Sequence, residues 1–92
     1  MTNTFTIFEF RYVDKDTGTG FCVYARTEET ADKIIAIENE QNVYFFIKPK
    51  FRRFKRKYTT EKPPYELEQE QLDFVTKRRN KRLKYIAEKK DL

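Results

Sequence analysis

The 92-residue chain contains no histidine and no tryptophan, and it has only one cysteine, two glycines and three prolines. Without histidine, the chain lacks the usual general base and the commonest metal ligand of proteins. The single cysteine, Cys22, excludes an internal disulfide. A reducing compartment fits this usage, so we expect a cytoplasmic protein. Because Cys22 lies within an apolar run, the sequence predicts a buried structural thiol.

Long apolar runs are also missing. No run approaches the roughly 20 residues that a helix needs to span a bilayer. The N-terminus has no basic segment followed by a continuous apolar one, which a signal peptide would show. We therefore expect no membrane partner.

Groups suited to catalysis are scarce. A Ser, Thr or Cys nucleophile would have no histidine base. The paired carboxylates fall in a predicted turn (Asp14 and Asp16) and at a predicted helix start (Glu28 and Glu29), where capping and solubility explain them. We expect no enzyme, no cofactor and no metal, while a two-carboxylate metal site remains the open enzymatic alternative.

Aromatic residues and charge are abundant instead. Nine phenylalanines and six tyrosines argue against disorder and can build the core of one small domain. The net charge is +5, and it is unevenly distributed: residues 1–46 carry four basic and eight acidic groups, whereas residues 47–92 carry sixteen and seven. Such asymmetry favours oriented binding to a polyanion.

The first half of the chain predicts two strands, a helix and a third strand. The strands are expected at residues 4–13 and 21–26, joined by a glycine-containing turn, and at residues 43–47. The last of these is nearly all apolar, so it should be central in the sheet or buried on both faces. Period two places Phe8, Phe10 and Tyr12 on one face of the first strand. The helix should begin after Thr27 as N-cap and end near Glu40, with Asn42 as a stop.

The second half predicts a long helix at residues 65–89, after a linker that contains Pro63 and Pro64. Its apolar stripe is interrupted by Arg79, so its second half should project past the core. We expect an α+β fold in a single domain: residues 1–62 form a ββαβ core with an antiparallel or mixed sheet and a basic arm at 48–58, and residues 63–92 form the C-terminal helix.

The arm carries seven basic residues within positions 48–57 and no acidic one. Phe51, Phe54 and Tyr58 are interleaved with them, at spacings of three and four that suit a helical face, and a strand continuing to Thr60 is the alternative. Lysine and arginine neutralise phosphates, and aromatic rings stack on unpaired bases. The three aromatics are candidate stacking residues, although packing into the core is the commoner role of phenylalanine.

A second basic cluster, with six basic residues among positions 77–84, lies on the predicted long helix. A helix that is basic on most sides is typical of contact with a phosphate backbone, and a solvated surface helix is the alternative. Together the two clusters give the candidate nucleic-acid-binding residues Lys48, Lys50, Arg52, Arg53, Lys55, Arg56, Lys57, Lys77, Arg78, Arg79, Lys81, Arg82 and Lys84.

Part of the chain, within residues 20–47, resembles half of a known domain family. The segment Gly20-Phe21-Cys22-Val23-Tyr24, followed by Thr30–Ile35, resembles the second half of an RNA-recognition motif. Cys22 stands where that family has Gly or Ala, and the first nineteen residues are too few for its β-α-β opening. The resemblance implies shared local geometry, in which Phe21 or Tyr24 would be a stacking residue.

Two function classes follow. The first is a small nucleic-acid-binding protein that contacts DNA or RNA mainly through phosphates, with limited sequence readout. The second is a protein-binding inhibitor or adaptor, of the kind that phages and mobile elements use, whose basic face occupies a partner's nucleic-acid channel or acidic surface. The sequence does not separate them, because both need the same positive surface.

Overall fold

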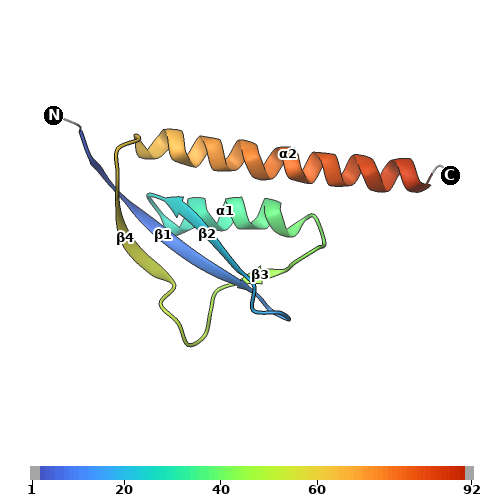
Figure 1. Cartoon of the computed structure of the whole chain (residues 1–92), viewed down its shortest axis with the longest axis horizontal. Helices are drawn as coiled ribbons and strands as arrows, with labels where there is room; N and C mark the ends of the chain where they lie inside the picture. Colours follow the sequence, from blue (N-terminus) through green and yellow to red (C-terminus); the bar gives the residue numbers. More distant parts are fainter. Residues whose placement is uncertain (1–2, 91–92) are drawn as a thin grey trace.

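A computed structural model describes residues 3–90 and shows a four-stranded antiparallel sheet with two helices, the α+β fold that the sequence predicts (Figure 1). The elements in chain order are β1 (Phe5–Asp14), β2 (Gly20–Ala25), α1 (Glu28–Asn39), β3 (Phe46–Ile47), β4 (Lys55–Thr60) and α2 (Pro64–Lys90).

The long strand β1 is the centre of the sheet. Strand β2 pairs with one edge of it, from Phe8↔Ala25 to Val13↔Gly20. The other edge is shared, because β3 pairs only with Val13 and Asp14 while β4 pairs with residues 5–10. The basic segment between β3 and β4 therefore leaves this edge as a loop and returns to it.

The core lies between one face of the sheet and the helices. Phe10 and Tyr12 of β1 are buried there, as the period-two pattern predicts, and Phe8 packs against the same cluster. The remaining buried members of the cluster are Val23, Ala25, Ala31, Ile34, Ile35, Phe46 and Val75. A small chain thus obtains its core from a few large side chains.

Helix α1 has the expected ends. The Thr27 hydroxyl accepts a hydrogen bond from the Thr30 backbone N–H, and Glu28 and Glu29 occupy the first turn. Asn42 has a φ of 61°, a left-handed conformation that asparagine tolerates better than most residues, and it follows the end of the helix.

Helix α2 begins at the second residue of the Pro63–Pro64 pair, where a proline fits the first turn. It lies along the outer edge of β2. The Gln71 side chain pairs with the backbone of Tyr24, donating to its carbonyl at 2.6 Å and accepting from its N–H at 2.8 Å. The second half of α2 extends beyond α1, as predicted from the interrupted stripe (Figure 1).

The predicted buried strand at residues 43–47 is wrong in extent and in burial. Only Phe46 and Ile47 form β3, and Val43, Tyr44 and Phe45 are exposed. Hydrogen bonds from side chains replace a longer backbone ladder here. Asp14 accepts from the Phe45 N–H at 2.7 Å, and the Asn39 amide accepts from the Phe46 N–H and donates to the Phe46 carbonyl.

The basic arm is extended, so the strand alternative is confirmed and the helical one is wrong. Residues 48–54 form the loop and residues 55–60 form β4.

The prediction of a buried thiol is also wrong, because Cys22 is exposed on the sheet face opposite the core. Among the described residues, no helix is long and apolar enough to cross a membrane.

Candidate nucleic-acid interface

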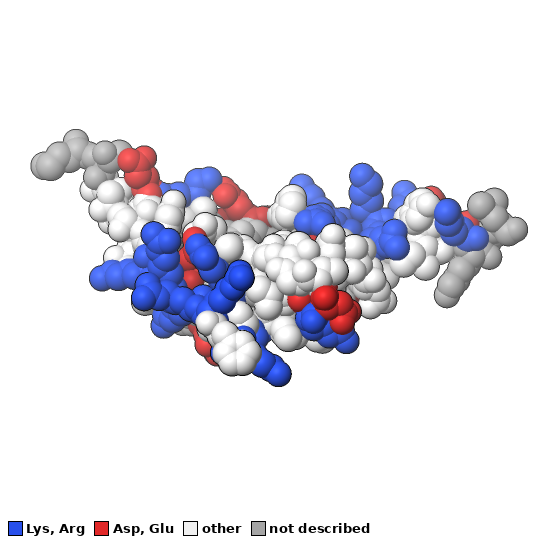
Figure 2. Space-filling view, turned by 60° about the horizontal axis from the view of Figure 1, so that its bottom comes forward, with Lys and Arg blue, Asp and Glu red and all other residues white. Residues whose placement is uncertain are grey.

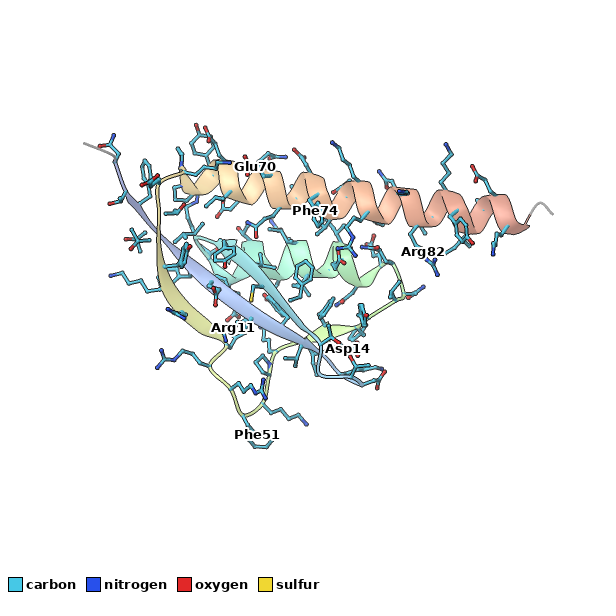
Figure 3. All side chains as sticks on the ribbon, viewed as in Figure 1. Arg11, Asp14, Phe51, Glu70, Phe74 and Arg82 are labelled. Carbon is cyan, nitrogen blue, oxygen red and sulfur yellow. The ribbon has the colours of Figure 1, made fainter. Side chains whose placement is uncertain are left out.

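The loop of the basic arm is fixed at both ends. At its start, Lys48 forms ion pairs with Glu28 at 2.9 Å and Asp32 at 3.4 Å, both on α1. At its end, the Phe54 ring packs against Phe10 and Tyr12, with centroid distances of 5.5 and 5.2 Å. Residues 50–53 between these ends are exposed, and Phe51 lies at the tip of the loop, away from α2 (Figure 3).

Three arginines line a pocket of about 290 Å³ on the sheet face opposite the core: Arg11 of β1, Arg53 of the loop and Arg56 of β4. An adjoining pocket of about 240 Å³ adds Arg52 beside Arg11, Arg53 and Cys22. Arg53 and Arg56 form no ion pair with any acidic side chain that the structure describes. Like charges brought together in this way repel each other, so the pocket favours an anion.

Glu9 is the acidic group beside the pocket, and it positions Arg11. Its carboxylate accepts from the Arg11 guanidinium at 2.8 Å and from the Tyr24 hydroxyl at 3.0 Å. The bond from Arg11 holds the pKa of Glu9 below its ordinary value, against the opposing effect of burial. Burial, together with the bond to Glu9, raises the pKa of Tyr24 to about 12. Near neutral pH, Glu9 is therefore ionised and the Tyr24 hydroxyl keeps its proton.

Two tyrosines lie next to the pocket on the sheet face opposite the core, which we call the open face. In the sheet register, Arg56 is opposite Glu9 and Tyr58 is opposite Ile7, so Arg56 and Tyr58 share a face. The rings of Tyr24 and Tyr58 are 5.2 Å apart, and 44% of the Tyr58 surface is exposed. The face thus combines cationic and aromatic groups.

The other predicted arm residues are divided between two faces. Lys50 and Arg52 are exposed in the loop. Lys55 and Lys57 lie on the core side of β4, where the Lys55 ammonium stands 4.1 Å from the Phe8 ring centroid. Of the predicted stacking residues, Phe54 is in the core, Tyr58 is on the open face and Phe51 is 97% exposed.

The second basic cluster is partly used inside the protein. Arg78 pairs with the buried Glu38 at 3.3 Å, and Arg79 pairs with Glu40 at 2.9 Å, so both tie α2 to α1. Burial raises the pKa of Glu38, although Arg78 opposes this effect. The cluster's exposed residues without an ion pair in the described structure are Lys77, Lys81, Arg82 and Lys84.

The structure does not merge the two clusters. Figure 2 shows one group of lysines and arginines over β4 and the loop before it, and another along the second half of α2, with mostly uncharged surface between them. Each cluster therefore presents its own positive surface.

Sequence reasoning missed Arg11, which is isolated from both basic clusters in the chain. The signal that could have identified Arg11 is the period-two alternation of β1, which places it on the sheet face opposite Phe8, Phe10 and Tyr12. Of the residues implied by the partial RNA-recognition resemblance, Phe21 packs against the core and Tyr24 lies on the open face.

Metal-binding clusters are absent from the described part of the chain: no three His, Cys, Asp or Glu side chains gather within reach of one ion. Comparison of the chain with protein-family models, with curated proteins and with solved structures found no match.

Proposed function

We propose that the protein binds nucleic acid through the open face of its sheet and the adjoining basic arm. The observation that supports this most directly is the pocket formed by Arg11, Arg53 and Arg56, since Arg53 and Arg56 form no ion pair with any acidic side chain that the structure describes. Guanidinium groups match phosphate oxygens with two parallel hydrogen bonds, which makes arginine the preferred residue for such a site.

The arm around the pocket extends this surface. Lys50 and Arg52 are exposed in the loop, and Arg52 lines the adjoining pocket. Each phosphate that these groups neutralise releases condensed counterions, so affinity should fall steeply as salt rises. Contacts of this kind fix the position of the strand without reading its sequence.

The test is equilibrium binding of a labelled oligonucleotide, measured by fluorescence anisotropy from about 50 to 200 mM salt. We expect binding at low salt. The double variant Arg53→Gln with Arg56→Gln should weaken it by about tenfold or more and make the slope of log K against log salt shallower by about 1.4 to 1.8.

The matched control is Lys15→Gln with Lys33→Gln, which removes the same charge from the acidic half of the chain. It should leave the slope almost unchanged. Absence of binding to DNA and RNA at about 50 mM salt would refute the proposal, and so would an equal effect of the two double variants, because only net charge would then matter.

A second candidate function is binding to a protein, and the exposed apolar segment between α1 and β3 favours it. Val43, Tyr44 and Phe45 are three consecutive residues with 40–58% exposure. Apolar side chains that gather on a surface are typical of protein contacts. A pull-down with and without nuclease separates the two functions: a protein partner that survives digestion supports the second candidate.

A further inference from the structure

We propose that the nucleic acid bound at this face is single-stranded, with one unpaired base stacked on Tyr58, the adjacent phosphate held by Arg53 and Arg56, and a second base stacked on Phe51. This inference rests on the proposed function and adds the class of nucleic acid and the residues that select it.

The Tyr58 ring lies in a supported position. Its cross-strand neighbour on the open face is Ile7, which is fully buried although it is not part of the main core cluster. The Tyr24 ring packs beside it at 5.2 Å, with an angle of 53° between the ring planes. The Tyr24 hydroxyl is in turn fixed by Glu9. A ring whose neighbours are fixed loses little conformational entropy when a base stacks on it.

The spacing of Tyr58 and Arg56 suits one nucleotide. The two residues are separated by one position on β4 and point to the same face, which places their α-carbons about 6.6 Å apart along the strand. A nucleotide whose base lies on the Tyr58 ring therefore has a phosphate within reach of the Arg56 guanidinium, and Arg53 lines the same pocket.

Phe51 provides the second aromatic surface. Its side chain is 97% exposed at the loop tip, between Lys50 and Arg52 (Figure 3). The fold gains nothing from a phenylalanine ring held in water, since its apolar surface is left unburied. Two cationic neighbours and a free ring form the combination that binds the backbone and a base together.

These features select an unpaired strand over a duplex. The faces of bases in a duplex are covered by their neighbours, so Tyr58 and Phe51 can stack only on bases that are unpaired or extruded.

The experiment compares labelled oligothymidylate and oligouridylate of about 16 nucleotides with a duplex of the same length, over the same salt series of about 50 to 200 mM. We expect tighter binding of the single strands. Tyr58→Leu and Phe51→Ala should each weaken single-strand binding by about tenfold while leaving the salt slope unchanged, because neither removes a charge.

Tyr65→Leu is the matched aromatic control, since Tyr65 is exposed at the start of α2 and lines a different pocket, together with Thr30 and Lys33 of α1. It should have no effect on binding. Circular dichroism checks that each variant is folded, and Phe51→Ala keeps the test decisive because so exposed a side chain contributes no packing.

The outcomes separate the two proposals. Equal binding of duplex and single strands, with no effect of either aromatic variant, overturns the single-strand inference and leaves the proposed function standing. The inference also fails, and the proposed function stands, if only the Arg53 and Arg56 double variant loses binding. Absence of binding to every oligonucleotide overturns both.

Discussion

Asp14 joins two distant segments of the chain through one carboxylate. Its Oδ2 atom accepts from the backbone N–H groups of Asp16 and Thr17 and from the Thr17 hydroxyl, and its Oδ1 atom accepts from the Phe45 N–H. The hairpin turn and the approach to β3 therefore depend on the same charged group. These bonds, that from Phe45 first, hold its pKa below the ordinary value.

The variant Asp14→Asn should lower the urea midpoint of unfolding at pH 7, because the amide offers one acceptor in place of two. The folded-state pKa of Asp14 lies below the unfolded value of 3.8, so its stabilisation is complete above that value and is lost as the pH falls through the folded pKa. The difference in urea midpoint between wild type and variant should therefore narrow in acid, when the same measurement is made at about pH 2.

Asp16→Asn is the control for this prediction, because it changes the neighbouring carboxylate of the same turn. Urea unfolding followed by circular dichroism at both pH values provides the measurement. A difference in urea midpoint that persists in acid would show that the Asp14 charge does not cause the stabilisation. An equal drop in midpoint in the Asp16 variant would show the same.

At the scale of elements, β1, β2, α1 and α2 follow from the sequence because local signals agree with the fold. Alternation in β1, the Thr27 cap and the long run without glycine or proline each specify an element with little outside help. Residues 43–47 have the composition of a buried strand, yet β3 is short. Its limits are set by Asn39 and Asp14, two polar side chains from other elements, and composition does not reveal such bonds.

The position of α2 depends on a contact that is equally invisible in the sequence. Gln71 bonds the outward backbone groups of Tyr24 and also donates to the Leu67 carbonyl, so it covers the free edge of β2 in place of another strand. Arg26 adds an ion pair to Glu68 at 2.8 Å on the same side. Glutamine in a helix normally indicates only a solvated surface.

We expect Gln71→Ala to lower the free energy of unfolding by about 1–3 kcal/mol, because it leaves a half-buried N–H and C=O without partners. Gln69→Ala is the matched control two residues away, whose amide bonds only the exposed Asp73. It should change stability by less than about 0.5 kcal/mol. Chemical denaturation measures both, and similar values for the two variants would show that the edge contact is dispensable.

Over the whole molecule, the acidic first half partly neutralises the basic second half. Four acidic residues of α1 and its end pair with basic residues from beyond position 46: Glu28 and Asp32 with Lys48, Glu38 with Arg78, and Glu40 with Arg79. The sequence reveals the asymmetry but not this pairing. It therefore locates the two basic clusters but not the ion pairs that Lys48, Arg78 and Arg79 form within the protein.

Two separate positive surfaces remain, along a molecule 56 Å in its longest dimension. A short strand of about 4–6 nucleotides reaches only one of them, whereas a strand of about 16 or more can contact both. The pocket variant, Arg53→Gln with Arg56→Gln, should therefore weaken the binding of short and long strands alike. Lys81→Gln with Lys84→Gln should weaken the long strand selectively, because these α2 residues lie on the other surface.

The measurement is an anisotropy titration of each double variant with both strand lengths, beside the control Lys15→Gln with Lys33→Gln. In the α2 variant, the advantage of the long strand over the short one should shrink and its salt slope should become shallower by about 1.4. If the α2 variant weakened the short strand as strongly as the long one, the second cluster would itself be the primary site. If it weakened neither, Lys81 and Lys84 would serve solvation alone.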